Sequence, residues 1–326
     1  MGASKSNSRR TFLSATGATA VATALGVIGV RPSHAQQEIP NSSGTAPPKL
    51  KAPEGATDCH IHIYDSRFQQ HSPGRADPKN ATVRDYQTLQ KRIGTSRVVV
   101  VTPRNYATDN RVTLDALAQL GASARGIAVV HPTISDADLR ALNDGGIRGI
   151  RFSLTGGAAP IVTWDMVEPL AKRVADLGWH VQFVLRGNQI VEHADLLQRL
   201  PTQLVFDHMG LPTLPAGIED ASFGVLRSLV DRGRTWVKLS GAYINSKIGP
   251  PDYPEATKIA QALVSAAPER LVWGSDWPHP GEQGKSPLPD DAVLFDLITA
   301  WAPQESTRRR ILVESPESLY GFAKST

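Results

Sequence analysis

The chain has 326 residues, with 35 lysines and arginines against 31 aspartates and glutamates, which gives a formal charge of +4. Cys59 is the only cysteine, so an internal disulfide framework is excluded. The excess positive charge lies in the first 35 residues, and the rest of the chain carries 31 basic and 31 acidic residues. This balance gives no electrostatic basis for binding nucleic acid or an anionic membrane.

Residues 1–35 have the pattern of an export signal. Arg9 and Arg10 are followed by Thr-Phe-Leu, then by an Ala/Val/Thr/Gly/Leu run and by Ser33-His34-Ala35. A basic start, an apolar middle and a small-residue cleavage site are typical of secretory signals, and paired arginines indicate the twin-arginine route. We expect cleavage after Ala35, passage through the twin-arginine export machinery and a periplasmic location. Polar interruptions in the run argue against a stable membrane anchor.

Residues 36–51 are rich in proline, serine, glycine and glutamine and show no periodicity, so they predict a disordered linker. Residues 52–326 contain no further low-complexity break. That length is ordinary for a single α/β barrel domain.

Eight short β-rich runs occur in this domain, most of them separated by amphipathic segments such as Trp164–Leu177. Strands that alternate with helices of this length predict βαβ units, and eight units predict a closed (β/α)8 TIM barrel. An open doubly wound sheet is disfavoured because no Gly-rich phosphate loop follows the first run. The runs are Ala56–His62, Arg97–Thr102, Gly126–His131, Gly146–Ser153, Trp179–Leu185, Gln203–His208, Trp236–Gly241 and Leu271–Asp276.

Alternation along each strand predicts which side chains face the barrel interior. In the first strand we expect Asp58, His60 and His62 inside and Cys59 with Ile61 against the helices. In the sixth we expect Leu204, Phe206 and His208 to share one face. Arg151 ends the fourth strand and Asp276 the eighth. Polar residues therefore meet at the carboxyl ends of four strands, which is where TIM barrels build active sites: His60, His62, Arg151, His208 and Asp276.

Several motifs resemble the amidohydrolase superfamily, in particular its amidohydrolase-related branch, which contains 2-pyrone-4,6-dicarboxylate lactonase and sugar-lactone enzymes. The resemblance covers the chain from Ala56 onward and implies a hydrolase that opens a lactone or a similar small cyclic ester. The motifs that carry it are Thr57-Asp58-Cys59-His60-Ile61-His62, Gly146-Ile147-Arg148-Gly149-Ile150-Arg151-Phe152, Phe206-Asp207-His208-Met209-Gly210, Lys238-Leu239-Ser240-Gly241-Ala242-Tyr243 and Trp273-Gly274-Ser275-Asp276-Trp277-Pro278-His279.

Two positions depart from the superfamily pattern. Metal-dependent members supply a lysine or histidine from strand five, where this chain has Gln182 and Val184 on the expected inner face. The resemblance therefore favours catalysis with no metal cofactor, although His60, His62 and Asp276 are the residues that would hold zinc if one is bound. The second departure is Ile244-Asn245, where the pyrone lactonase has a carboxylate-binding arginine, so a dicarboxylate substrate is not indicated.

Opening an ester requires a base for water and groups that stabilise the oxyanion. We expect Asp276 to be the base, with His60, His62 and His208 as oxyanion donors and Asp58 orienting the histidines. Arg151 is expected to bind an anionic or polar substituent of the small-molecule substrate. Tyr243 and Trp277 are expected either to line the pocket or to pack.

Two other classes of function remain open on the sequence. One is a zinc-dependent decarboxylase or hydrolase of the same superfamily, with metal at His60, His62 and Asp276. The other is a non-catalytic periplasmic binding protein on a barrel scaffold, because a fold does not fix a function. The polar residues at the strand ends favour an enzyme, since a binding protein has no need of a poised aspartate.

Overall fold

The structure, a computed structural model, describes residues 38–71, 77–155 and 161–325, so the expected signal segment lies outside the described residues. Within the described part, eight parallel strands pair in chain order into one sheet. The strands are β1 (Thr57–Ile61), β2 (Arg97–Val101), β3 (Ala124–Ala128), β4 (Ile147–Ser153), β5 (His180–Val184), β6 (Leu204–Phe206), β7 (Thr235–Leu239) and β8 (Leu271–Trp273).

The sheet closes between β1 and the segment that follows β8. The backbone N–H of Asp276 donates to the carbonyl oxygen of His60 at 2.8 Å, and the N–H of His62 donates to that of Trp277 at 2.8 Å. These bonds join the two edges of the sheet, and the expected TIM barrel is confirmed.

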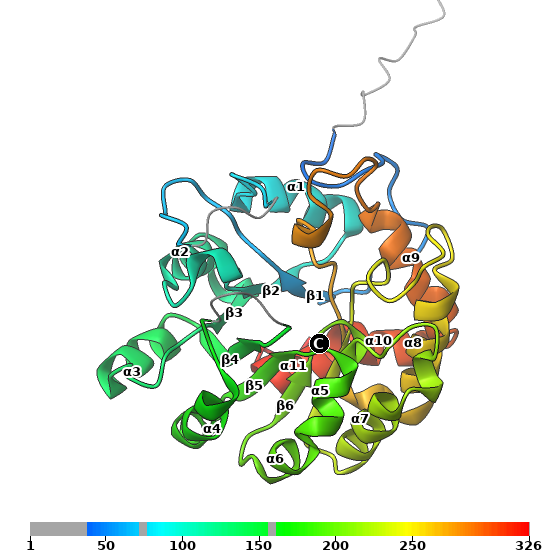
Figure 1. Cartoon of the computed structure of the whole chain (residues 1–326). Coiled ribbons are helices and arrows are strands. Elements are labelled where there is room, and N and C mark those ends of the chain that lie inside the picture. Colours follow the sequence, from blue (N-terminus) through cyan, green and yellow to red (C-terminus); the bar gives the residue numbers. More distant parts are fainter. Residues whose placement is uncertain (1–37, 72–76, 156–160, 326) are drawn as a thin grey trace, which may run out of the picture. The chain divides into compact units, whose positions relative to one another are not determined.

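Helices surround the strands from α1 round to α9, while α11 crosses behind the barrel centre in the view of Figure 1. No helix in the described ranges is long and apolar enough to cross a membrane. The helices are α1 (Val83–Ile93), α2 (Arg111–Leu120), α3 (Asp136–Asp144), α4 (Val167–Ala175), α5 (Gly187–Glu192), α6 (Ala194–Arg199), α7 (Ala221–Asp231), α8 (Pro254–Ala266), α9 (Asp291–Trp301), α10 (Glu305–Arg309) and α11 (Ser315–Tyr320).

Helix α1 shows how local sequence sets these boundaries. The Thr82 side chain accepts from the backbone N–H of Asp85, and the Asp85 carboxylate accepts from the N–H of Thr82, which forms a capping box. Gly94 ends the helix with φ 89°, a left-handed conformation that glycine adopts at little cost. The residues that α1 buries recur at helical spacing and are Val83, Tyr86, Leu89 and Ile93.

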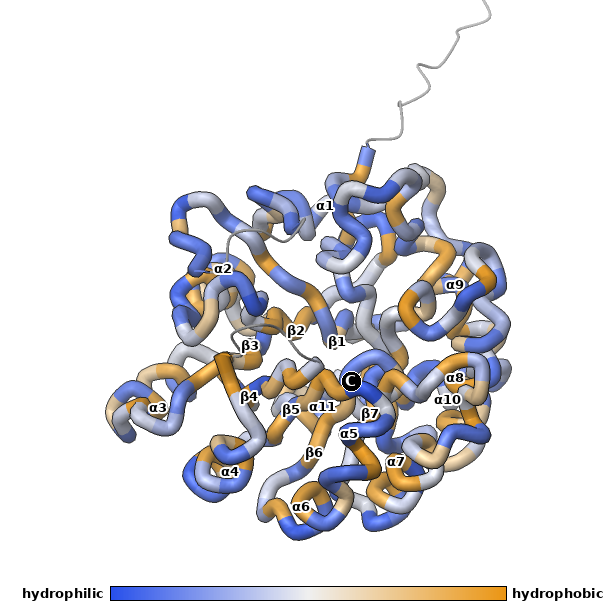
Figure 2. The backbone as a smooth tube through the Cα atoms, viewed as in Figure 1, coloured by the Kyte–Doolittle hydropathy of each residue, from blue (hydrophilic) through white to orange (hydrophobic). Residues whose placement is uncertain are grey.

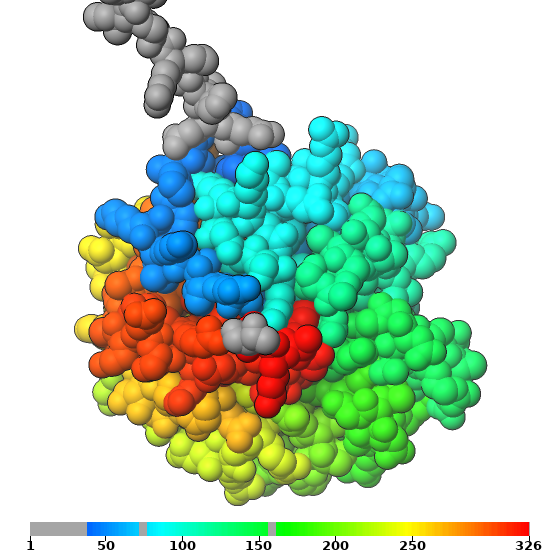
Figure 3. All heavy atoms as spheres, turned by 180° about the vertical axis from the view of Figure 1, so that it is seen from behind, coloured from blue at the N-terminus to red at the C-terminus, as the bar shows by residue number. Residues whose placement is uncertain are grey.

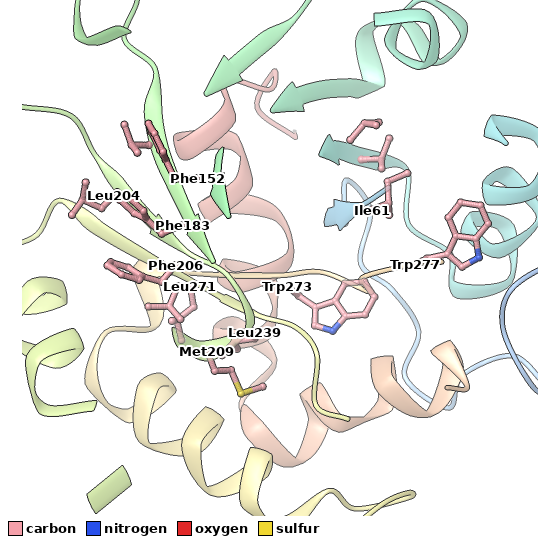
Figure 4. Packing of buried hydrophobic residues seen from close by; sticks show 14 of the residues in the cluster. Ile61, Phe152, Phe183, Leu204, Phe206, Met209, Leu239, Leu271, Trp273 and Trp277 are labelled. Carbon is pink, nitrogen blue, oxygen red and sulfur yellow. The ribbon is translucent and has the colours of Figure 1, made fainter. Parts of the chain in front are cut away.

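Apolar side chains form one layer between the strands and the helices. Orange segments follow the strands and the inward sides of the helices in Figure 2, whereas the outer helical surfaces are mostly blue. Within this layer, Phe183 packs against Phe152 and Phe206, with ring centroids 5.9 and 5.7 Å away (Figure 4). The aromatic row fixes which face of β4, β5 and β6 points outward, and so leaves the alternate residues inside.

The C-terminal segment closes the amino-terminal end of the barrel. Leu319, Tyr320 and Phe322 belong to a second apolar cluster with interior strand residues such as Val99 and Val272. The Tyr320 ring lies edge-on to the ring of His180, the first residue of β5, with centroids 5.5 Å apart. The red C-terminal residues lie at the centre of the face shown in Figure 3. This plug leaves the carboxyl ends of the strands as the open end.

Residues 38–50, here called the N-terminal strap, lie within the segment that was expected to be a linker at 36–51. The strap runs beside α1 and α9 in Figure 1. The indole Nε1–H of Trp277 donates to the carbonyl oxygen of Pro40 at 2.8 Å, and the N–H of Leu50 donates to Oδ1 of Asp296 at 2.8 Å. Aperiodic, proline-rich sequence can be held by hydrogen bonds to a neighbouring surface without forming a helix or strand, and composition alone does not reveal those partners.

Candidate active site

A bulge in β1 separates the side chains that we expected on one face. The pairing of β1 with β2 shifts register between Asp58 and Ile61. Cys59 consequently joins the cluster inside the barrel. The Asp58 carboxylate instead accepts from the N–H and Oγ–H of Ser275 at 2.9 and 2.6 Å and lies 3.4 Å from the Tyr86 hydroxyl of α1. The expected facing of Asp58 and Cys59 was therefore wrong, and Asp58 anchors the loop after β8 rather than orienting the histidine rings.

His60 and His62 meet Asp276 at the open end of the barrel. Nε2 of His60 lies 3.2 Å from Nε2 of His62, and these two atoms lie 3.5 and 3.6 Å from Oδ1 of Asp276. All three residues are buried, with exposed fractions of 0, 4 and 4%. A Cβ at Gly274 would lie 2.6 Å from Cβ of His60, so a residue without a side chain is required beside that histidine. The expected convergence of strands one and eight is present.

The hydrogen-bond partner of His62 fixes its tautomer. Nδ1 lies 2.8 Å from the carbonyl oxygen of Val101, which can only accept, so Nδ1 carries the hydrogen. Burial, followed by the nearby Arg151 cation, lowers the pKa of His62 to about 4. At neutral pH its Nε2 therefore presents a lone pair. The expectation that His62 donates a hydrogen bond to an oxyanion is not met by this arrangement.

A buried ion network that the sequence motifs did not predict lies beneath these residues. Oδ1 of Asp207 lies 3.2 Å from Nδ1 of His60 and 3.4 Å from Nζ of Lys238. Oδ2 accepts from Nε of Arg151 and from Nε2 of Gln182, both at 3.0 Å. Although burial alone raises the pKa of Asp207, Lys238, His60 and Arg151 hold it well below its usual range. Gln182, at the strand-five position, is therefore fully engaged by Asp207 and by Lys238, whose Nζ donates to its Oε1 at 2.8 Å.

The facing of strand six was predicted wrongly. Leu204 and Phe206 belong to the layer under the helices, while Val205 packs inside the barrel. Asp207 is therefore the inward residue. His208 reaches the site by another route, because its φ of 50° turns the chain out of the strand into a short helical turn. The large apolar residues at 204 and 206, matched to the outer row of strand five, were the available signal for Asp207.

His208 lies beside the other histidines at the mouth of the barrel. Its ring centroid is 4.9 Å from that of His60, and its Nδ1 lies 3.0 Å from Oγ of Ser240 on the segment after β7. With Ser240 donating to Nδ1, the hydrogen is on Nε2, which makes His208 a hydrogen-bond donor toward a ligand.

A cavity of about 260 Å³ opens over this group. His62, His208 and Asp276 line its polar floor together with Arg151, whose Nε is held by Asp207. Ile244 forms part of the wall and is 43% exposed. Other described residues that line it are Tyr64, Asp77, Pro103, Arg104, Asn105, Ser153, Thr155, Val184, Leu211, Pro280 and Gly281.

Tyr243 and Trp277 are absent from the described residues that line this cavity. Trp277 is fully buried and packs against Tyr86 with ring centroids 5.6 Å apart, so its expected pocket role is not supported and its role is packing. The Tyr243 hydroxyl donates to Oδ2 of Asp276 at 2.6 Å. Although burial alone raises the pKa of Asp276, the neighbouring histidines and this hydrogen bond hold it below its usual value, so the carboxylate is ionised at neutral pH.

The comparisons with known proteins agree with this geometry. The family described as Amidohydrolase matches residues 57–322. This chain belongs to the amidohydrolase family. It is 34% identical over 283 residues to a 2-pyrone-4,6-dicarboxylate hydrolase of Comamonas testosteroni, covering 84% of this chain and 92% of the relative. It is 32% identical to a 4-sulfomuconolactone hydrolase of Rhizobium radiobacter, covering 88% and 98%.

An apo crystal structure of an Agrobacterium tumefaciens protein resembles the amidohydrolase fold described here with a TM-score of 0.79. Its sequence is 29% identical, and the match covers 87% of this chain and 99% of that protein. The family resemblance stated from the sequence motifs is thereby confirmed across the barrel domain.

The histidines and aspartate of this amidohydrolase have a spacing that suits one metal ion. Zinc bonds to nitrogen and oxygen at 2.0–2.2 Å, so tetrahedral ligand atoms lie roughly 3.4 Å apart. The three distances among His60, His62 and Asp276 are 3.2, 3.5 and 3.6 Å. His62 also presents the lone pair that a metal needs. These residues would hold the ion, and a second possible group combines His60 with Asp207 and His208.

The same atoms also form a consistent arrangement without an ion. Nζ of Lys238 lies 3.3 Å from Nδ1 of His60 and can donate to it. The hydrogen of His60 is then on Nε2, where it points to the lone pair of His62 Nε2. Nδ1 of His60 therefore has both an acceptor, Asp207, and a donor, Lys238, beside it. This pair suits either tautomer of His60.

Proposed function

We propose that this amidohydrolase hydrolyses a lactone that carries an anionic substituent. The observation that carries the proposal is the ionised carboxylate of Asp276, placed at the floor of a cavity that also holds Arg151 and His208. The named relatives support it, since both act on cyclic esters or pyrones with acidic groups.

Asp276 is the base in this mechanism. Its Oδ2 is occupied by the Tyr243 hydroxyl, so Oδ1 is the oxygen that takes a proton from water. The water oxygen attacks the lactone carbonyl and forms a tetrahedral oxyanion. Collapse of this intermediate breaks the ring C–O bond, and the proton on Asp276 passes to the departing ring oxygen. The product is an open hydroxy acid.

His208 and Arg151 are the groups suited to stabilise the oxyanion and bind the substrate. Nε2–H of His208 donates into the cavity when Ser240 donates to Nδ1. The guanidinium of Arg151 is fixed by its Nε contact with Asp207, and its terminal nitrogens form a bidentate donor pair for a carboxylate or sulfonate. The proposed role of His60 is to orient His62 and the carboxylate of Asp276.

A metal ion, when bound by His60, His62 and Asp276, would act as a Lewis acid toward the carbonyl and lower the pKa of water. We propose that turnover does not require one. The ammonium of Lys238, 3.3 Å from Nδ1 of His60, opposes a dication at that histidine, and Gln182 is engaged by its neighbours. Activity should survive dialysis against a chelator. One tightly bound zinc per chain whose removal abolishes turnover would favour the zinc-dependent hydrolase instead.

We further propose that the cavity wall after β7 provides no subsite for a second anionic group and that the cavity therefore does not favour dicarboxylates. Ile244 lines the wall after β7, and the amide of Asn245 donates to the carbonyl oxygens of His208 and Gly241, so neither side chain offers a cation. The test measures the hydrolysis of a panel of neutral, monoanionic and dianionic lactones, with proton release as the signal. Monoanionic lactones should have the highest kcat/KM, and Ile244→Arg should raise kcat/KM for dianionic lactones alone. Equal rates on neutral lactones would contradict a role for Arg151.

Export through the twin-arginine route to the periplasm remains a proposal that rests on residues 1–35. Replacement of Arg9 and Arg10 by lysine should leave an unprocessed precursor in the cytoplasm. Cell fractionation measures this outcome, and normal processing of that variant would contradict the twin-arginine route.

A further inference from the structure

A chain of three polar contacts leads away from Asp276 on the side opposite the histidines. The Tyr243 hydroxyl lies 2.6 Å from Oδ2 of Asp276 and 3.2 Å from Nδ1 of His279. Nε2 of His279 lies 3.1 Å from Oδ2 of Asp291. His279 and Asp291 are 0% exposed, and neither is among the described residues that line the cavity. The mechanism above uses neither of them.

The donor and the acceptor in each of these three contacts follow from the atoms involved. Carboxylate oxygens accept hydrogen bonds, so the tyrosine hydrogen lies toward Asp276 and an imidazole hydrogen lies toward Asp291. Tyrosine has one hydroxyl hydrogen, and a hydrogen bond from His279 must therefore be donated by Nδ1 to the phenol oxygen. Asp291 lies 3.1 Å from the opposite ring nitrogen, so the imidazole is held between the Asp291 carboxylate and the Tyr243 phenol.

The backbone of the loop after β8 holds Asp276 and His279 in the positions that these contacts require. Asp276 and His279 both adopt positive φ, at 64° and 58°, and the N–H of His279 donates to the carbonyl oxygen of Asp276 at 2.7 Å. Asp291 begins α9, and its Oδ1 has no hydrogen-bond partner among the described residues. A buried carboxylate with one side-chain partner is costly unless that partner is held in place. The Asp291 carboxylate is therefore directed to His279.

We propose that His279 and Asp291 are positioning residues that hold the Tyr243 hydroxyl on Oδ2 of Asp276, and thereby leave Oδ1 as the oxygen that accepts the proton of water. This inference rests on the proposed function, because it assigns the two oxygens of the proposed base. If the contacts from Asp291 through His279 to Tyr243 are broken, the Tyr243 hydroxyl rotates away from Oδ2 of Asp276. Both carboxylate oxygens of Asp276 then compete for the water molecule, and fewer bound waters are placed to attack the lactone carbonyl.

A double-mutant cycle between Tyr243→Phe and Asp291→Asn tests the proposal. Each single variant should lower kcat roughly 10- to 100-fold, the range of a hydrogen bond to a charged group, with KM changed less than threefold. Asp291→Asn should add less than twofold in the Tyr243→Phe background, because its effect passes through the tyrosine. Full additivity of the two effects would overturn the proposal. Asp290→Asn is the matched control, since Asp290 caps α9 and pairs with Arg92 but touches none of these groups.

A second readout needs no substrate, so it separates failure of this proposal from failure of the proposed function. With 3-fluorotyrosine incorporated, the ¹⁹F resonance that Tyr243→Phe removes should shift in Asp291→Asn and stay unchanged in Asp290→Asn. An unmoved resonance would overturn the proposal even if no lactone is hydrolysed. If Asp291→Asn does not fold, His279→Gln takes its place in both experiments, with the same expected and contrary results.

Discussion

Replacement of Asp276 by asparagine removes the base with little change in shape. The asparagine oxygen can still accept from the Tyr243 hydroxyl, which lies 2.6 Å from Oδ2 in the wild type. The amide nitrogen then takes the place of Oδ1, 3.6 Å from Nε2 of His62, whose lone pair can accept from it. Both hydrogen-bonding positions are retained, so the variant should fold and keep the substrate contact of Arg151.

The expected loss is therefore in chemistry rather than in binding. General-base assistance contributes about 10²- to 10⁴-fold, so kcat of Asp276→Asn should fall by that factor while KM changes little. Initial rates of proton release from a monoanionic lactone measure kcat, and thermal unfolding checks the fold. Asp58→Asn is the control variant, because the Asp58 carboxylate contacts Ser275 and Tyr86 rather than the histidine rings. A kcat for Asp276→Asn within about tenfold of wild type would refute the assignment of the base.

Three further substitutions test the network around the base. Arg151→Lys should raise KM about tenfold or more and lower kcat less, measured by steady-state kinetics, because lysine lacks the bidentate donor pair. Asp207→Asn should lower the free energy of unfolding in urea by about 3–5 kcal/mol at neutral pH, since it leaves buried cations uncompensated. The pKa of Asp207 is depressed in the folded state, so this difference should persist above about pH 4 and shrink as the pH falls below it. Gly274→Ala should displace His60 and reduce kcat about 10²-fold, with no change in metal content.

The alternation of strand and helix was enough to predict the barrel. Eight buried strands with turn residues and helices between them can form few arrangements other than a closed barrel. Boundaries were less certain. The third strand was expected at Gly126–His131 but spans Ala124–Ala128, since pairing with β2 extends it to Ala124 and Arg125, and the guanidinium of Arg125 donates to the carbonyl oxygen of Gly321. Composition in a short window does not encode such pairing.

The candidate site was predicted only in part. Arg151 lies within β4, and its inward direction was predicted correctly from the alternation. The inward direction of Asp276 was also predicted correctly, although Asp276 lies beyond the end of β8 and has φ 64°. The β1 bulge exchanges the positions of Asp58 and Cys59, and the left-handed turn at His208 hides the inward Asp207. The β1 bulge has no glycine to mark it, and in the turn at His208 the glycine, Gly210, comes only two residues after the residue at which the chain leaves the strand. Lys238 was recognised only as part of a motif, because a fully buried lysine makes sense only beside its partner Asp207.

The N-terminal strap has a practical consequence for how this protein is produced. The family match begins at residue 57, yet the strap reaches Trp277, next in sequence to the proposed base, through Pro40. A recombinant chain trimmed to the matched region would expose the Trp277 indole N–H and remove the support of the Asp276 turn. An expression unit that keeps this contact therefore includes Pro40, and any affinity tag at that end needs a spacer before it.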